Sequence, residues 1–168
     1  MIRFFTFATV AGFAALNGVN ALAQNALPTE SHKVLTAELA VEAAQAAIAA
    51  CKAQGYGVSV VVADRMGMPK VVIVRDGPRG VGPEVARRKA YTAAMLRVST
   101  GDFTKRVSQP GAFNPGMYDS ELSTGQGGVP IKVGDDTIGG IAAAGAPGGD
   151  KDEACAIAGL DKIKDSLK

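Results

Sequence analysis

The segment VSVVVADRMG, residues 58–67, decides the fold of this chain. Its β-branched run from Val58 to Ala63 predicts a strand, and Asp64 to Gly67 supplies the residues of a tight turn. A second β-branched run, Val71 to Val74, follows at once, so the two runs predict a β-hairpin. Because both runs are continuously apolar at their centres, we expect a sheet that is covered on both faces.

A second hairpin is predicted near the other end of the chain. Its strands are Val129 to Val133 and Thr137 to Ala144, around the turn residues Gly134-Asp135-Asp136. Adjacent hairpins pair their strands antiparallel, whereas a nucleotide-binding fold of the parallel kind alternates single strands with helices. The sequence therefore predicts an α+β fold with an antiparallel sheet.

Three helices accompany the hairpins. Thr36 can cap a first helix that runs through Cys51, a second runs from Pro83 to about Ser99, and Asp150 can cap the last. The apolar positions expected to face the core are Leu35, Leu39, Ala43, Ile48 and Cys51 in the first helix, and Ala154, Ile157, Leu160, Ile163 and Leu167 in the last.

The segment after the second helix carries the longest irregular stretch. We expect short, less regular structure through Arg106, and then a loop over residues 109–129 that contains Met117 and Tyr118. A loop of about twenty residues is long for a small domain, and such loops are usually functional or mobile.

The first 23 residues have the pattern of a secretory signal peptide. Met1 to Arg3 is positively charged, Phe4 to Leu16 is largely apolar, and Ala21-Leu22-Ala23 offers small residues for cleavage before Gln24. No other stretch is long and apolar enough to span a membrane. We therefore expect a periplasmic or secreted protein, with a polar N-terminal lead over residues 24–34 and a single domain over residues 35–168.

The composition excludes several functions. The chain has 168 residues, which suits one domain with a proper core. Its 18 basic and 16 acidic residues leave a net charge of +2, so nucleic-acid binding is not expected. One histidine, His32, and two cysteines cannot supply a zinc site of four Cys/His ligands.

Cys51 and Cys155 form a candidate pair. An oxidising compartment makes two thiols of a secreted domain candidates for one disulfide, and both lie on predicted helices. Two buried free thiols are the alternative. A bridge that closes a loop of about 100 residues would stabilise the fold by roughly 4–5 kcal/mol in the chain-entropy model.

A cationic group lies on the second predicted helix, which carries Arg87, Arg88, Lys89, Tyr91 and Thr92. At helical spacing Arg87 and Tyr91 share one face, as do Arg88 and Thr92. The cations could meet propionates or other carboxylates. A solvated cationic face is the simpler interpretation, and the spacing alone favours it.

Four motifs in order resemble a known family. Residues 58–67, 86–94, 127–131 and 138–146 together look like the GlcG/HbpS-type haem-binding proteins, over about residues 35–160. This family is also similar to the C-terminal domain of a corrinoid adenosyltransferase. The resemblance implies a profilin-like fold, with a central antiparallel sheet flanked by helices, and assembly into a homo-oligomer. It implies haem as the cofactor, in preference to a corrinoid.

The resemblance also suggests site residues. Lys89 and Thr92 match family-typical positions, as do the glycines at 127–128. Some haem-binding relatives use a histidine from the region of the first helix, and this chain has none there. Iron could instead take His32 from the lead, or a weaker ligand such as Met117 or Tyr118.

The first hypothesis is therefore a secreted or periplasmic haem-binding protein, in haem or iron handling or sensing. Haem would lie between the second helix and the long loop, or at a subunit interface built from them. Arg87, Arg88 or Lys89 would pair with propionates, and Met117 or Tyr118 would lie near the iron or the ring. The alternatives are an enzyme or accessory protein acting on a small carboxylate or other catabolic metabolite, and a non-catalytic sensor. The enzyme lacks an obvious acid–base pair or nucleophile.

Overall fold

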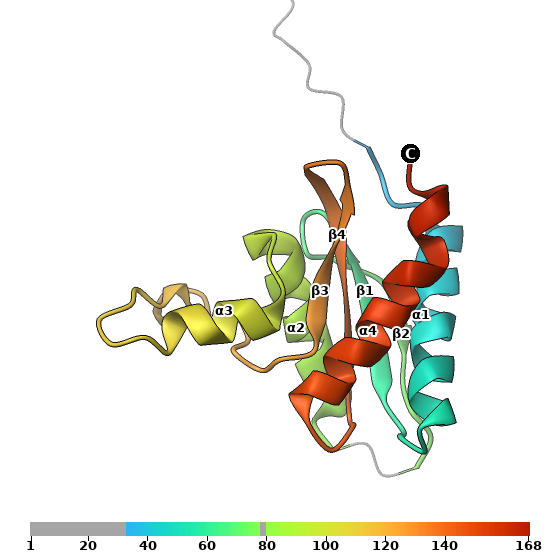
Figure 1. Ribbon diagram of the computed structural model, residues 1–168, viewed down its shortest axis with the longest axis horizontal. Helices are drawn as coiled ribbons and strands as arrows, with labels where there is room; N and C mark the ends of the chain where they lie inside the picture. Colours follow the sequence, from blue (N-terminus) through green and yellow to red (C-terminus); the bar gives the residue numbers. More distant parts are fainter. Residues whose placement is uncertain (1–32, 78–79) are drawn as a thin grey trace, which may run out of the picture. The chain divides into compact units, whose positions relative to one another are not determined.

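The sheet has four strands that pair antiparallel throughout. A computed structural model describes residues 33–77 and 80–168; the proposed signal peptide, residues 1–23, the lead up to residue 32, and His32 itself lie outside the described residues. The strands are β1 (Ser59–Asp64), β2 (Pro69–Ile73), β3 (Gly128–Val133) and β4 (Asp136–Ala144), in the spatial order β2-β1-β4-β3. Both predicted hairpins are confirmed, and β1 pairs with β4 to join them (Figure 1).

Helices cover the two faces of this sheet. The helices α1 (Ala37–Ala53) and α4 (Gly149–Ile163) pack together on one face, and α2 (Gly82–Leu96) packs against β1 and β4 from the other (Figure 1). The α+β fold is confirmed, and the arrangement agrees with a profilin-like fold. No helix in residues 33–77 and 80–168 is long and apolar enough to cross a membrane.

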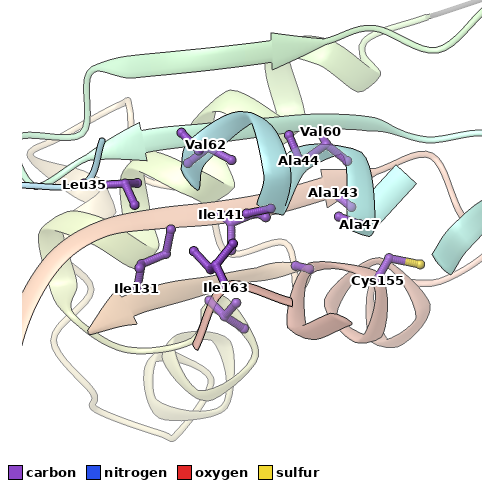
Figure 2. Close-up of a cluster of buried hydrophobic side chains, with 14 of the residues drawn as sticks. Leu35, Ala44, Ala47, Val60, Val62, Ile131, Ile141, Ala143, Cys155 and Ile163 are labelled. Carbon is purple, nitrogen blue, oxygen red and sulfur yellow. The ribbon is translucent and has the colours of Figure 1, made fainter. Parts of the chain in front are cut away.

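Alternation along β1 divides the core into two parts. Val60 and Val62 contact α1 and α4, whereas Val61 contacts α2, because successive side chains of a strand point to opposite faces. Figure 2 shows the larger cluster, on the α1 and α4 face. The expectation of cover on both faces is correct for β1 and wrong for β2, an edge strand that α2 covers only in part, so that Val72 is exposed.

Helix α1 is joined to α4 by a disulfide bond. The Cys51 and Cys155 sulfurs are 2.07 Å apart, with Cα atoms at 5.5 Å and a sequence separation of 104. This confirms the disulfide over two free thiols. The predicted cap of α1 is also confirmed, since the Thr36 hydroxyl accepts a hydrogen bond from the backbone N–H of Leu39 at 3.3 Å.

The predicted start of α4 is wrong, and its predicted apolar face is correct only in part: Ile163 is buried, and Leu160 and Leu167 pack against the core. Gly148, at φ 145°, occupies the cap position, and Asp150 lies within the first turn. The buried positions are Asp152, Cys155, Ala156, Gly159 and Ile163, whereas Ile157 is exposed. The reason is close helix packing: a Cβ at Gly159 would lie 2.5 Å from the Ala43 carbonyl oxygen of α1, so small side chains face the neighbour.

The segment after α2 is more regular than expected. Residues Thr100–Val107 form helix α3, which is capped by the Ser99 hydroxyl accepting from the backbone N–H of Asp102 at 3.0 Å. The loop that follows contains one short 3₁₀ turn, Pro115–Met117, and ends where β3 begins. In Figure 1, α3 and this loop project away from the sheet, beside α2.

Candidate functional site

The outer face of α2 is held against the long loop by charged contacts. Arg87 donates to both oxygens of Glu84 at 2.8 Å and also pairs with Glu121 of the loop. Arg88 donates from Nε to Glu84 at 2.8 Å and from Nη1 to the Ser120 carbonyl oxygen at 3.0 Å. The two predicted guanidinium groups therefore lie side by side and face carboxylates of their own chain.

These contacts change the titration of the groups involved. Hydrogen bonds from Arg87 and Arg88 lower the pKa of Glu84 to about 2, and bonds to Glu84 and Glu121 raise the pKa of Arg87. Glu84 therefore remains an anion at any physiological pH. Glu84 precedes Arg87 by three residues and Arg88 by four, which is the spacing of side chains that meet on a helix. Of the contacts in this network, these two are the ones that a local sequence pattern indicates.

Tyr91 adds a third contact between α2 and the loop. Its hydroxyl donates to Asp119 Oδ2 at 2.9 Å, and this bond raises the pKa of the phenol. Its ring lies under the turn between β1 and β2, where a Cβ on Gly67 would come within 2.4 Å of the ring. Glycine at 67, at φ 76°, is thus required by both the turn and the ring.

Lys89 points the other way, into the protein. Its Nζ lies 2.8 Å from Asp152 Oδ2 and 3.2 Å from the Ala143 carbonyl oxygen, and both side chains of the ion pair are buried. Asp152 Oδ1 also accepts from the backbone N–H of Ala146 at 2.9 Å. The close approach of Gly127, whose Cβ would lie 2.6 Å from Nζ, brings the end of the loop onto the pair.

Thr92 holds the loop on its inner side. The hydroxyl donates to the Arg88 carbonyl oxygen at 2.7 Å and accepts from the backbone N–H of Ser123 at 2.8 Å. Lys89 and Thr92 therefore position the loop against α2, while Arg87 and Arg88 face its outer part. The sequence grouped Arg87, Arg88, Lys89 and Thr92 on one helix. It did not indicate Asp152, because no local pattern connects this residue to Lys89, 63 positions away.

An exposed apolar group lies on the loop just before the charged contacts. We call Phe113, Met117 and Tyr118 the loop patch; their residues are 69%, 79% and 81% exposed. The rings of Phe113 and Tyr118 stack with centroids 5.8 Å apart. The patch contains both predicted iron ligands of the loop, and Phe113 is the member that sequence reasoning missed.

The residues present suit a haem group. A flat apolar ring with two carboxylates would find exposed aromatic and thioether side chains on the loop patch, and a pair of guanidinium groups where the same loop contacts α2. Met117 and Tyr118 offer an exposed sulfur and an exposed phenol, both of which are known axial ligands of haem iron. Among the described residues no cluster of three His, Cys, Asp or Glu side chains could hold a bare metal ion.

Comparisons with known proteins agree on the class. The antiparallel sheet with helices on both faces defines an α+β domain of the profilin-like class. The family described as haem-degrading protein HbpS-like matches residues 35–161, and the chain belongs to this family. Family membership supports haem as the ligand. No curated protein matches the chain.

Three solved structures are similar. The crystal structure of HbpS is 36% identical, covers 79% of this chain and 92% of its own, and has a TM-score of 0.72. A double mutant of HbpS from Streptomyces reticuli is 34% identical over 92% of this chain and 97% of its own, also with a TM-score of 0.72. The crystal structure of a PduOC:haem complex is 23% identical, covers 78% and 96%, and has a TM-score of 0.71; it shows a shared fold.

Proposed function

We propose that this protein binds haem on the outer face of α2, outside the cytoplasm. The ring would lie against the loop patch, and Arg87 and Arg88 would bind the propionates. The HbpS-like family and the similar fold of a PduOC:haem complex support haem as the ligand. The signal peptide pattern and the disulfide support a periplasmic or secreted protein.

One observation carries the choice of face. Arg87 and Arg88 both bind Glu84 of their own helix and contact the loop, Arg87 at the Glu121 carboxylate and Arg88 at the Ser120 carbonyl oxygen, just after the exposed patch in the chain. The Glu121 carboxylate accepts a charge-assisted hydrogen bond from Arg87, as a propionate would. Binding then exchanges one carboxylate for another, so the propionate has to displace Glu121 and not only water.

The iron ligand would come from the same patch or from the lead. Met117 and Tyr118 are the exposed candidates, and His32 lies outside the described residues. Bound haem supplies a redox-active iron, which is the chemistry that the family description, haem degrading, requires. The chain's own part is to hold the propionates at Arg87 and Arg88 and to cover one face of the ring.

We also propose that the protein forms a homo-oligomer. Exposed apolar side chains outside the loop patch, Met66, Met68 and Val72, lie on the β1–β2 hairpin and on the free edge of the sheet. An edge strand with exposed apolar side chains is a natural place for a second chain to pair or pack. Light scattering at tens of micromolar measures this directly, and a strict monomer would contradict it.

A haemin titration of the mature, oxidised chain tests the proposed function. We expect a saturable Soret change with a fixed stoichiometry, and a parallel titration with iron-free protoporphyrin IX separates ring and propionate binding from axial ligation. Weaker binding of the iron-free porphyrin indicates an axial ligand, and equal binding indicates none. A folded protein that gives no saturable Soret change would refute the proposal.

A further inference from the structure

A pocket lies on the other side of the sheet, at the C-terminal end of α1. It has a volume of about 430 Å³ and is formed by that end of α1, the connection to β1, and the end of β2. Ile48, Val58 and Ile73 make its apolar wall, and these side chains belong to the core that faces α1 and α4. The pocket is therefore separate from the outer face of α2. Its volume is within the range of small-molecule sites.

Arg75 is the best-positioned charged group of this pocket. Its backbone N–H donates to the Ser59 hydroxyl at 3.2 Å, and its Nη1 donates to the Gly57 carbonyl oxygen at 3.1 Å. The guanidinium lies against two glycines: a Cβ on Gly57 would be in van der Waals contact with Nε at 3.6 Å, and one on Gly145 with Nη1 at 3.6 Å. The side chain is thus fixed against backbone at both sides.

The same guanidinium has an unused donor. Its Nε is buried and has no hydrogen-bond partner among the described residues. A buried N–H without an acceptor costs free energy, so a ligand acceptor that reached this Nε would relieve that cost. The geometry of a guanidinium fork suits a carboxylate, which can accept from two N–H groups at once.

The surroundings add positive charge and an aromatic surface. Lys52 and Tyr56 both line the pocket. The ammonium of Lys151 lies 5.4 Å from the centroid of the Tyr56 ring. Asp76 is the one carboxylate among the lining residues, and its side chain is exposed to solvent. Two lining cations against one carboxylate leave a net positive pocket with an apolar wall.

We propose that this pocket is a second ligand site, for a small monocarboxylate with an apolar or aromatic body. The carboxylate would pair with Arg75 and Lys52, and the body would lie against Ile48, Val58 and Tyr56. This site is independent of the haem proposal, because no residue of α2 or of the loop patch takes part.

Amide NMR of the ¹⁵N-labelled, haem-free, oxidised chain tests the site, with benzoate as the probe and benzamide as its neutral isostere. We expect saturable benzoate shifts at Gly57 and Arg75 up to tens of millimolar, and binding of benzamide at least tenfold weaker. Equal binding of the two probes, or shifts confined to another face, would overturn the proposal. Inorganic phosphate binding here more tightly than benzoate would also overturn it, in favour of a phosphate site.

Charge reversal at an exposed lysine separates this site from a general charge effect. Lys52→Glu should weaken benzoate binding at least tenfold, whereas Lys132→Glu, the same change at another exposed lysine on β3, should leave it unchanged. Unperturbed amide shifts in the sheet show that both variants fold. Equal benzoate affinity in the two variants would refute the role of Lys52 and the assignment of the site.

Discussion

Replacing Arg87 and replacing its partner Glu121 should change haem affinity in opposite directions. If a propionate displaces Glu121, then Glu121→Gln removes the charged competitor and should tighten haem binding. The pair is partly exposed, at 29% and 41% for the two side chains, so releasing it costs up to about 1 kcal/mol. That limit corresponds to about a fivefold lower Kd.

Arg87→Ala removes the propionate partner itself. A hydrogen bond to a charged group is worth about 1.5–3 kcal/mol, and the variant no longer has to break the contact with Glu121, which returns up to about 1 kcal/mol. The net loss is about 0.5–3 kcal/mol, or about 2- to 150-fold in Kd. This loss should shrink as salt rises, because the site is open to solvent.

Haemin titrations of the two variants, read from the Soret band, measure both effects. Glu42→Gln is the matched control: Glu42 pairs with Lys162 at 3.3 Å on the opposite face of the sheet, is similarly exposed, and should not alter haem affinity. Weaker binding in Glu121→Gln would show that Glu121 supports the site and does not compete for it. Wild-type affinity in Arg87→Ala and in the corresponding Arg88 variant would place the propionates elsewhere.

Three further predictions concern stability. Lys89→Met leaves Asp152 buried without its cation and should lower the free energy of unfolding by about 3–5 kcal/mol in urea titrations, whereas a loss below about 1 kcal/mol would show that the pair is not needed. Replacing Cys51 and Cys155 together by alanine should cost about 2–5 kcal/mol, and an unchanged denaturation midpoint in the reduced wild type would contradict this. The pKa of Glu84 lies at about 2 in the folded protein, below its ordinary 4.5, so the contribution of Glu84 to stability is present above about pH 4.5 and is lost as the pH falls towards 2. Glu84→Gln should remove this part of the acid dependence of stability, and an acid-unfolding profile identical to that of the wild type would refute the prediction.

Much of the fold follows from local patterns in the chain. The β-branched runs, the turn at 64–67 and the Gly134-Asp135-Asp136 turn are local signals, and both hairpins form where these signals lie. Thr36 is likewise a local cap that forms as predicted. The face of α4 was only partly predictable in this way. Leu160 and Ile163 pack against the core as expected, but the contact with α1 selects small residues such as Gly159, whereas a hydropathy pattern also favours Ile157, which is exposed.

The sequence by itself determined which residues of the candidate site are neighbours, and the tertiary structure alone decided which of them face the solvent. Arg87, Arg88 and Lys89 are consecutive on one helix, so their proximity is a property of the chain. Their directions depend on how α2 is rotated against the sheet, and that rotation buries Lys89 beside Asp152, 63 residues away. The loop carboxylates Asp119 and Glu121 meet α2 for the same reason. Helical spacing defines angles around an axis, but only packing against the rest of the protein chooses the side that is covered.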